Sequence, residues 1–116
     1  MKEFVKVMKA LSDPNRVKLL KLLQRRKMCV CEMQAALGIA QPTVSKHLKV
    51  LEGAGLVERK KEGLWVDYFL SDGGRSPYAA SLLGNLKHWL EDDMVIRDLT
   101  EMSKGVRRED ICRPRD

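Results

Sequence analysis

The sequence lacks the features that mark membrane, secreted and disulfide-stabilised proteins. No apolar run approaches the roughly 18 residues that a membrane-spanning helix needs. The first residues do not open the long apolar stretch of a signal peptide. The 116 residues contain only three cysteines, an odd number that argues against a disulfide framework. We therefore expect a cytoplasmic protein with no membrane partner, in which cysteines stay reduced unless they are catalytic, sensing or metal-bound.

Motifs of catalytic sites are also missing. The sequence has no Ser/His/Asp arrangement, no glycine-rich phosphate loop and no paired-carboxylate site. It has only two histidines, so a zinc site formed by His88, Glu91 and Asp92 at helical spacing is less favoured than a solvated acidic face. The sequence thus predicts a protein that is not an enzyme and has no catalytic cofactor.

The positive charge of the chain is concentrated in its first half, and the formal net charge is +6. Residues 1–28 hold nine Lys/Arg and two acidic residues, and residues 41–61 hold five and two, whereas residues 84–102 hold two and five. A basic surface of this kind suits a polyanion such as nucleic acid. A lysine-rich surface that only confers solubility has the same composition, so charge leaves both interpretations open.

Hydrophobic periodicity predicts a mostly helical chain with one β-hairpin. Asp13 and Pro14 are a good N-cap and first residue for the second helix, and Gly38 is a good C-cap for the third. Glu62-Gly63 is a plausible tight turn between two strands. The predicted elements are, in chain order, helices at about 4–11, 14–26, 31–37 and 42–52, strands at 56–61 and 64–70, and one long helix from about 77 to 99.

Residues 32–48 have the pattern of a helix-turn-helix, and the hairpin behind it would form a wing. Gly38 allows the sharp turn, and apolar side chains on both sides lock the two helices together. The second helix then presents short or polar side chains, without acids, to the major groove of DNA. We predict DNA contacts from this helix by Gln41, Thr43, Ser45, Lys46 and His47, and phosphate contacts beside the hairpin by Arg59, Lys60 and Lys61.

We expect residues 1–103 to form one winged helix-turn-helix domain for DNA binding and dimerisation. Its first and last helices carry apolar stripes without a sufficient core partner, which makes them the expected dimer surface. Two recognition helices would then read two half-sites of double-stranded operator DNA. Residues 104–116 are mostly charged and are expected to form a flexible C-terminal tail.

Four stretches occur in order along the chain: residues 10–20 (ALSDPNRVKLL), 29–32 (CVCE), 41–51 (QPTVSKHLKVL) and 55–68 (GLVERKKEGLWVDY). Together they resemble the ArsR family of metalloregulatory repressors, and the CVCE segment is similar to its arsenic-responsive branch. The resemblance implies a homodimeric winged-helix repressor. It further implies that the protein holds an operator shut and releases it when As(III) or Sb(III) binds Cys29 and Cys31.

The two cysteines are expected at the start of the helix that supports the recognition helix. Amide N–H groups at a helix N-terminus favour the thiolate, the form that takes up a soft ion such as As(III). Residues i and i+2 of a regular helix point about 200° apart. One ion held by both Cys29 and Cys31 should therefore distort the first turn and couple inducer binding to loss of the DNA-competent shape.

As(III) favours three thiolates, and the cysteine pair supplies two. Cys112 is the remaining thiol and could complete the site from its own or the partner protomer; a cellular thiol or a solvent ligand is the alternative.

The cysteines have other interpretations. They could form a redox or persulfide switch on the same scaffold, through partner-chain pairing or small-thiol adducts, because an i, i+2 disulfide is strained. They could also be two small buried hydrophobic residues. A thiol enzyme is disfavoured because the chain has no Cys-x-x-Cys motif.

Overall fold

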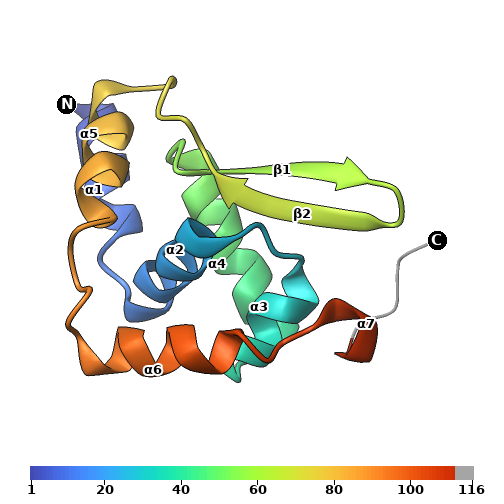
Figure 1. Ribbon diagram of the computed structural model, residues 1–116. Helices are drawn as coiled ribbons and strands as arrows, with labels where there is room; N and C mark the ends of the chain where they lie inside the picture. Colours follow the sequence, from blue (N-terminus) through green and yellow to red (C-terminus); the bar gives the residue numbers. More distant parts are fainter. Residues whose placement is uncertain (112–116) are drawn as a thin grey trace.

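The structure is a computed structural model that describes residues 1–111. Its order of helices and strands confirms the predicted winged helix-turn-helix, and Figure 1 shows the hairpin extending from the helices as the wing. The elements are α1 (Lys2–Ala10), α2 (Pro14–Arg25), α3 (Val30–Leu37), α4 (Gln41–Gly53), β1 (Val57–Glu62), β2 (Trp65–Leu70), α5 (Pro77–Leu86), α6 (Met94–Ser103) and α7 (Arg108–Ile111).

Helix α2 lies at the centre of the hydrophobic core. It begins as predicted, because the Asp13 carboxylate accepts hydrogen bonds from the backbone N–H groups of Asn15 (2.8 Å) and Arg16 (3.3 Å). Leu19 and Leu20 are fully buried, and each such side chain contributes about 1.5–3 kcal/mol through removal from water. The helix packs against α3, α4, α6 and β2, so it supports both the helix-turn-helix and the wing.

The wing is an antiparallel hairpin whose register runs from Val57 opposite Leu70 to Glu62 opposite Trp65. This pairing leaves Gly63 and Leu64 as the two-residue turn, one residue later than the predicted Glu62-Gly63 turn. Gly63 has φ of +61°, the left-handed conformation that such a turn requires and that glycine adopts without steric cost.

The prediction of one long final helix from 77 to 99 is wrong. Helix α5 ends at Leu86, and α6 starts after Asp93, whose carboxylate caps it by accepting from the Ile96 N–H at 3.1 Å. The apolar positions of the sequence follow one another without a clear gap because α5 and α6 each bury apolar side chains, with Leu82 and Leu86 on α5 and Leu99 on α6. Helix α1 packs against α5, whereas α6 packs across α2 and α3.

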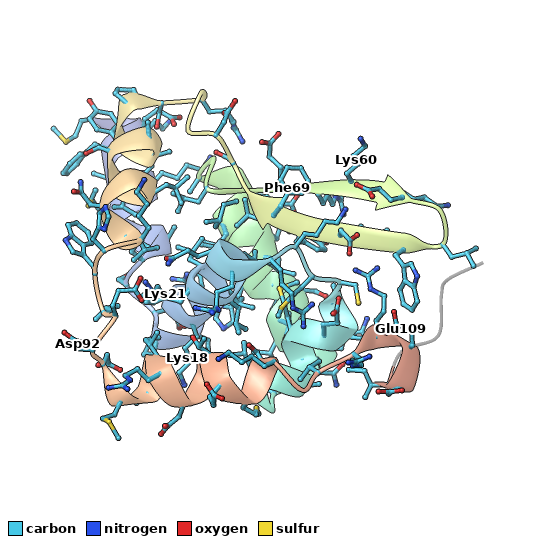
Figure 2. All side chains as sticks on the ribbon, viewed as in Figure 1. Lys18, Lys21, Lys60, Phe69, Asp92 and Glu109 are labelled. Atoms are coloured by element: carbon cyan, nitrogen blue, oxygen red, sulfur yellow. The ribbon has the colours of Figure 1, made fainter. Side chains whose placement is uncertain are left out.

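A buried lysine on α2 holds the connection between α5 and α6. Only 2% of Lys21 is exposed, and its Nζ donates to the carbonyl oxygens of Leu86 (2.9 Å) and Trp89 (2.8 Å). It also forms an ion pair with Glu91 at 3.4 Å. Figure 2 shows this side chain reaching from α2 toward the connection. A cation placed at the C-terminus of α5 stabilises its helical end there.

The predicted tail of residues 104–116 contains the short helix α7, which packs against α3. Arg108, in its first turn, has a side chain that is only 16% exposed. The division at residue 103 stays a prediction, but residues 108–111 lie against the domain that the sequence assigned to residues 1–103. Within residues 1–111, no helix has the length and apolarity needed to cross a membrane.

We predict that Lys21→Met lowers the free energy of unfolding by about 2 kcal/mol, because two carbonyl groups lose their shared donor in a buried position. Urea denaturation measures the change. Arg25→Met, an exposed cation on the same helix, serves as control and should change stability by less than about 0.5 kcal/mol. Equal stabilities of the two variants would contradict the role of Lys21.

Candidate functional site

The helix-turn-helix of α3 and α4 presents part of the predicted DNA-reading face. Gly38 ends α3 with φ of +69°, and its N–H donates to the Gln34 carbonyl at 2.8 Å. Val44 and Leu48 are buried and lock α4 onto the core. Thr43, Ser45 and Lys46 are exposed, and Gln41 is half-buried at the start of the helix.

His47 does not project outward as the sequence predicted. Its side chain is only 14% exposed and lies against the start of α2. Its Nδ1 is 3.3 Å from Arg16 Nη1, and its Nε2 is 3.9 Å from Asp13 Oδ1. The amphipathic spacing of α4 did not reveal this, because the partners of His47 are in another helix.

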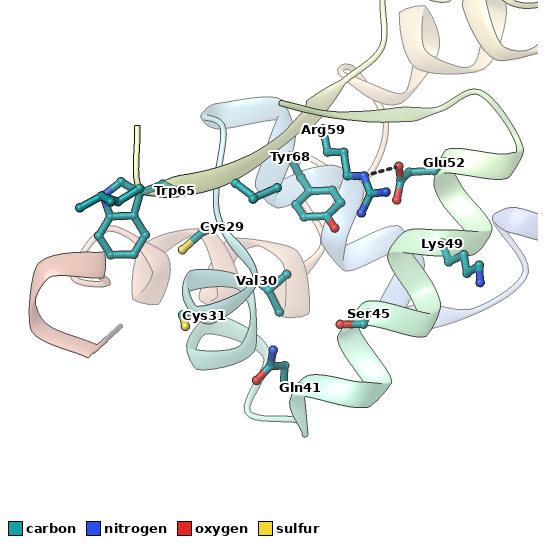
Figure 3. Close-up of a pocket in the computed structure, with 12 residues that line it drawn as sticks. Cys29, Val30, Cys31, Gln41, Ser45, Lys49, Glu52, Arg59, Trp65 and Tyr68 are labelled. Carbon is teal, nitrogen blue, oxygen red and sulfur yellow. Dashed lines mark ion pairs between the residues drawn. The ribbon is translucent and has the colours of Figure 1, made fainter. Parts of the chain in front are cut away.

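All three predicted wing cations, Arg59, Lys60 and Lys61, are exposed on β1. Arg59 Nε lies 3.5 Å from a carboxylate oxygen of Glu52 on α4, the ion pair drawn in Figure 3. Lys60 points away from the helices (Figure 2). The wing therefore carries positive charge beside the C-terminal part of α4.

A cleft of about 450 Å³ lies between α3, α4 and the hairpin. The cysteine pair and several side chains that were predicted to bind DNA line this same cleft, as Figure 3 shows. Its lining consists of Cys29, Val30, Cys31, Gln41, Ser45, Lys49, Glu52, Arg59, Leu64, Trp65, Val66 and Tyr68. A ligand of the thiols would thus lie beside the recognition helix and the wing.

Cys29 and Cys31 do not occupy equivalent backbone positions. Cys29 is the N-cap of α3, with extended φ and ψ of −84° and 169°, and Cys31 is in the first turn. The predicted separation of about 200° applies only when both residues are helical, and the extended backbone of Cys29 places this residue outside the helix. The Cys29 side chain accepts from the Glu32 backbone N–H as part of a capping box, so the first turn of α3 orients it.

The prediction that the helix N-terminus lowers the thiol pKa is wrong for Cys29. Burial raises the pKa of Cys29 to about 11, and the neighbouring Glu32 carboxylate adds to the increase. Only 6% of Cys29 is exposed, whereas Cys31 is half-buried. Desolvation outweighs the favourable end of the helix dipole, so Cys29 is a neutral thiol near pH 7.

A buried carboxylate, which the sequence analysis did not single out, organises the start of α3. Glu32 is 2% exposed, and its Oε1 accepts from the Cys29 N–H at 3.0 Å. Its Oε2 accepts from Arg26 Nη1 at 2.6 Å. Burial alone would raise the pKa of Glu32, but the bonds from Arg26 and from the Cys29 N–H lower it below its usual value. A Glu three residues after an N-cap is the capping-box pattern, which was the available sequence signal.

Arg108 joins this carboxylate to the wing. Its Nη2 lies 2.6 Å from Asp67 Oδ1 on β2 and 3.3 Å from Glu32 Oε1. Its guanidinium lies 4.7 Å from the ring centre of Trp65, which the sequence interpretation treated as a packing residue. Nothing in the local sequence around Arg108 indicates these contacts, because they connect residues about 40 and 80 positions apart.

The backbone just before Cys29 is also bound to the wing. The Met28 N–H donates to the Tyr68 carbonyl at 3.1 Å, and the Tyr68 N–H donates to the Met28 carbonyl at 2.8 Å. Tyr68 and Asp67 are neighbours on β2, so backbone and side-chain contacts tie the same part of the wing to the thiol site.

The described residues contain no group of three His, Cys, Asp or Glu side chains placed to hold a metal ion. Two thiols border the cleft, and Cys112, the predicted third ligand, lies outside the described residues. His88, Glu91 and Asp92 fall in the connection between α5 and α6. These three residues are therefore not on one helix, and the helical spacing that would place them together around a zinc ion is absent.

Comparisons with known proteins give consistent matches. The model of the bacterial regulatory protein family arsR matches residues 13–59. The arsenic resistance transcriptional regulator ArsR1 of Pseudomonas putida is 40% identical over 91% of this chain and 84% of its own length.

Two solved structures share the fold. The transcriptional repressor BigR from Xylella fastidiosa has a TM-score of 0.66 at 29% identity, covering 79% of this chain and 88% of that one. The homodimeric winged helix-turn-helix domain of Mb0332 from Mycobacterium bovis has a TM-score of 0.65 at 27% identity, covering 83% and 84%.

We predict that N-ethylmaleimide labels Cys31 at least about tenfold faster than Cys29 at pH 8 in a Cys112→Ser background. With a pKa of about 11, only about one Cys29 in a thousand is a thiolate at this pH, and the side chain is buried. Peptide mass spectrometry measures both rates. In urea the rates should converge, and equal rates in the native protein would contradict the burial of Cys29.

Proposed function

The chain belongs to the ArsR family of DNA-binding transcriptional regulators, and we propose that it is a repressor that As(III) or Sb(III) releases from its operator. The observation that carries the proposal is the cleft shared by Cys29, Cys31 and Gln41. A soft ion that binds both thiols lies next to the first residue of the recognition helix. ArsR1 of Pseudomonas putida, named as an arsenic resistance regulator, supports this inducer class.

Operator binding is assigned to the exposed face of α4 and to the wing. Gln41, Thr43, Ser45 and Lys46 supply donors and acceptors for base edges and phosphates in the major groove. Arg59, Lys60 and Lys61 supply phosphate contacts from the wing. His47 is retained as a candidate only through its exposed edge, because Arg16 and Asp13 flank its ring.

We assign the homodimer to α1 together with α5. Phe4, Val5 and Met8 are each about 40% exposed on α1, and Phe4 forms an edge-to-face ring contact with Tyr78 of α5 at 5.4 Å. Exposed apolar side chains on two packed helices favour association, and the related Mb0332 domain is described as homodimeric. A monomer mass in light scattering at micromolar concentration would contradict this assignment.

For As(III), the described residues supply two cysteine sulfur donors, which suit a soft ion once the thiol protons are displaced. We assign the third to Cys112, which follows Ile111, the last residue of α7. Helix α7 packs against α3, so the chain reaches residue 111 near the helix that carries the pair. A cellular thiol in the cleft is the alternative third ligand.

A thiol redox or persulfide switch on the same scaffold is the second candidate. The half-buried Cys31 borders the cleft and gives a small oxidant access to the pair. Oxidation or a thiol adduct would add bulk beside α4, as an inducer ion would.

We predict that arsenite weakens operator binding of the wild-type protein by about 5–150-fold, the usual range of coupling between two sites. Cys31→Ser should bind operator like the wild type but resist release. Cys29→Ser should do the same, because serine is also a good N-cap and preserves the start of α3. Fluorescence anisotropy with labelled operator measures the affinities.

Peroxide in place of arsenite separates the two candidate functions. Release by arsenite alone supports the proposal, and release by peroxide alone would replace it with the redox switch. X-ray absorption of the arsenite-loaded protein then tests the third ligand. Three sulfur neighbours in the wild type and two in Cys112→Ser would assign Cys112, whereas an unchanged count would remove it.

We predict that Lys46→Met reduces the slope of log affinity against log salt concentration by about 1, because one phosphate contact is lost. Lys87→Met, an exposed lysine between α5 and α6, is the matched control and should leave the slope unchanged. Equal slopes for the two variants would place Lys46 outside the operator contact.

A further inference from the structure

One guanidinium connects three parts of the molecule. Arg108 of α7 contacts Glu32 on α3 at 3.3 Å and Asp67 on β2 at 2.6 Å, and the same nitrogen atom, Nη2, makes both contacts. Both carboxylates are almost fully buried. Buried charges are costly without a partner, so the Arg108 guanidinium stabilises both carboxylates where they lie.

The carboxylate on α3 is directly connected to the thiol site. Glu32 Oε1, the oxygen that faces Arg108, also accepts from the Cys29 N–H at 3.0 Å. A change in the backbone of Cys29 therefore changes the position of the oxygen that Arg108 contacts. Arg26 holds the other oxygen and the Val106 carbonyl, so it anchors Glu32 to the segment before α7.

The cleft provides a second route to the same guanidinium. Trp65 lines the cleft with Cys29 and Cys31, and Figure 3 shows its indole beside the cysteine pair. Arg108 stacks on this ring, 4.7 Å from its centre, a contact that a planar cation makes favourably. A ligand of the thiols would meet Trp65 on one side and alter its contact with Arg108.

We propose that Arg108 is a positioning residue that couples ligand binding at Cys29 and Cys31 to the position of the wing. Because its contacts with Glu32 and Asp67 share one nitrogen atom, a displacement of Glu32 changes the hold of Arg108 on β2. The exposed Arg59, Lys60 and Lys61 of β1 pair with β2 and move with it. The inducer-linked part of this inference rests on the proposed function.

Operator release by arsenite in Arg108→Lys tests the coupling. Lysine keeps one positive charge beside the two carboxylates, which favours folding, but it lacks the planar guanidinium that stacks on Trp65 while one of its nitrogen atoms contacts both carboxylates. Arg107→Lys, at the exposed neighbouring position, is the matched control. The readout is the ratio of operator dissociation constants with and without arsenite, and X-ray absorption verifies that arsenite is bound to the thiols in each variant.

We predict that this ratio falls from the wild-type value of about 5–150 toward 1 in Arg108→Lys and stays at the wild-type value in Arg107→Lys. A residue with only a structural role would change melting temperature without changing the ratio. A wild-type ratio in Arg108→Lys, with arsenite bound, overturns the inference and leaves the proposed function intact.

Hydrogen exchange measured without arsenite distinguishes a failure of the Arg108 inference from a failure of the proposed function. Arg108→Lys should increase exchange at the amides of both Cys29 and β2, whereas Arg107→Lys should leave both protected. If arsenite does not release the wild-type protein from its operator, the proposed function fails. Hydrogen exchange then decides by itself whether Arg108 links the Cys29 segment to β2. Wild-type protection in Arg108→Lys then overturns the link as well.

Discussion

The buried carboxylate of Glu32 is the group on which the arrangement of the thiol segment, the C-terminal helix and the wing depends. It closes the N-terminus of α3 through the Cys29 N–H and meets Arg26 and Arg108. A carboxylate removed from water needs such partners, and two arginines plus a backbone donor meet that need. The consequence is that three segments far apart in the sequence share one electrostatic centre.

This centre explains why Cys29 behaves differently from a thiol at an open helix terminus. The same packing that encloses Glu32 also desolvates Cys29, and the negative carboxylate beside it opposes a thiolate. A soft ion must therefore displace a proton from a neutral thiol, which makes uptake depend on pH. The half-buried Cys31 offers the more accessible first contact.

The elements with strong local signals were predictable. The N-cap Asp13 with Pro14, the glycine at the end of α3 and the Gly63 turn each carry their own conformational preference, so element order and most boundaries followed from sequence. The split of the last helix did not, because Lys21, 65 residues before Leu86, supplies the buried cation that holds the break. His47 was placed wrongly for the same reason, since its partners lie on α2.

The sequence by itself determined the winged helix-turn-helix, the polar exposed residues of its second helix and the presence of two thiols before it, because these depend on periodicity, caps and residue type. Only the tertiary structure decided which groups surround the thiols. The contacts of Arg108 with Glu32 and Asp67 span 76 and 41 residues, and the cleft forms where α3, α4 and the wing meet. Burial and long-range ion pairs arise from packing, and no local pattern in the chain specifies them.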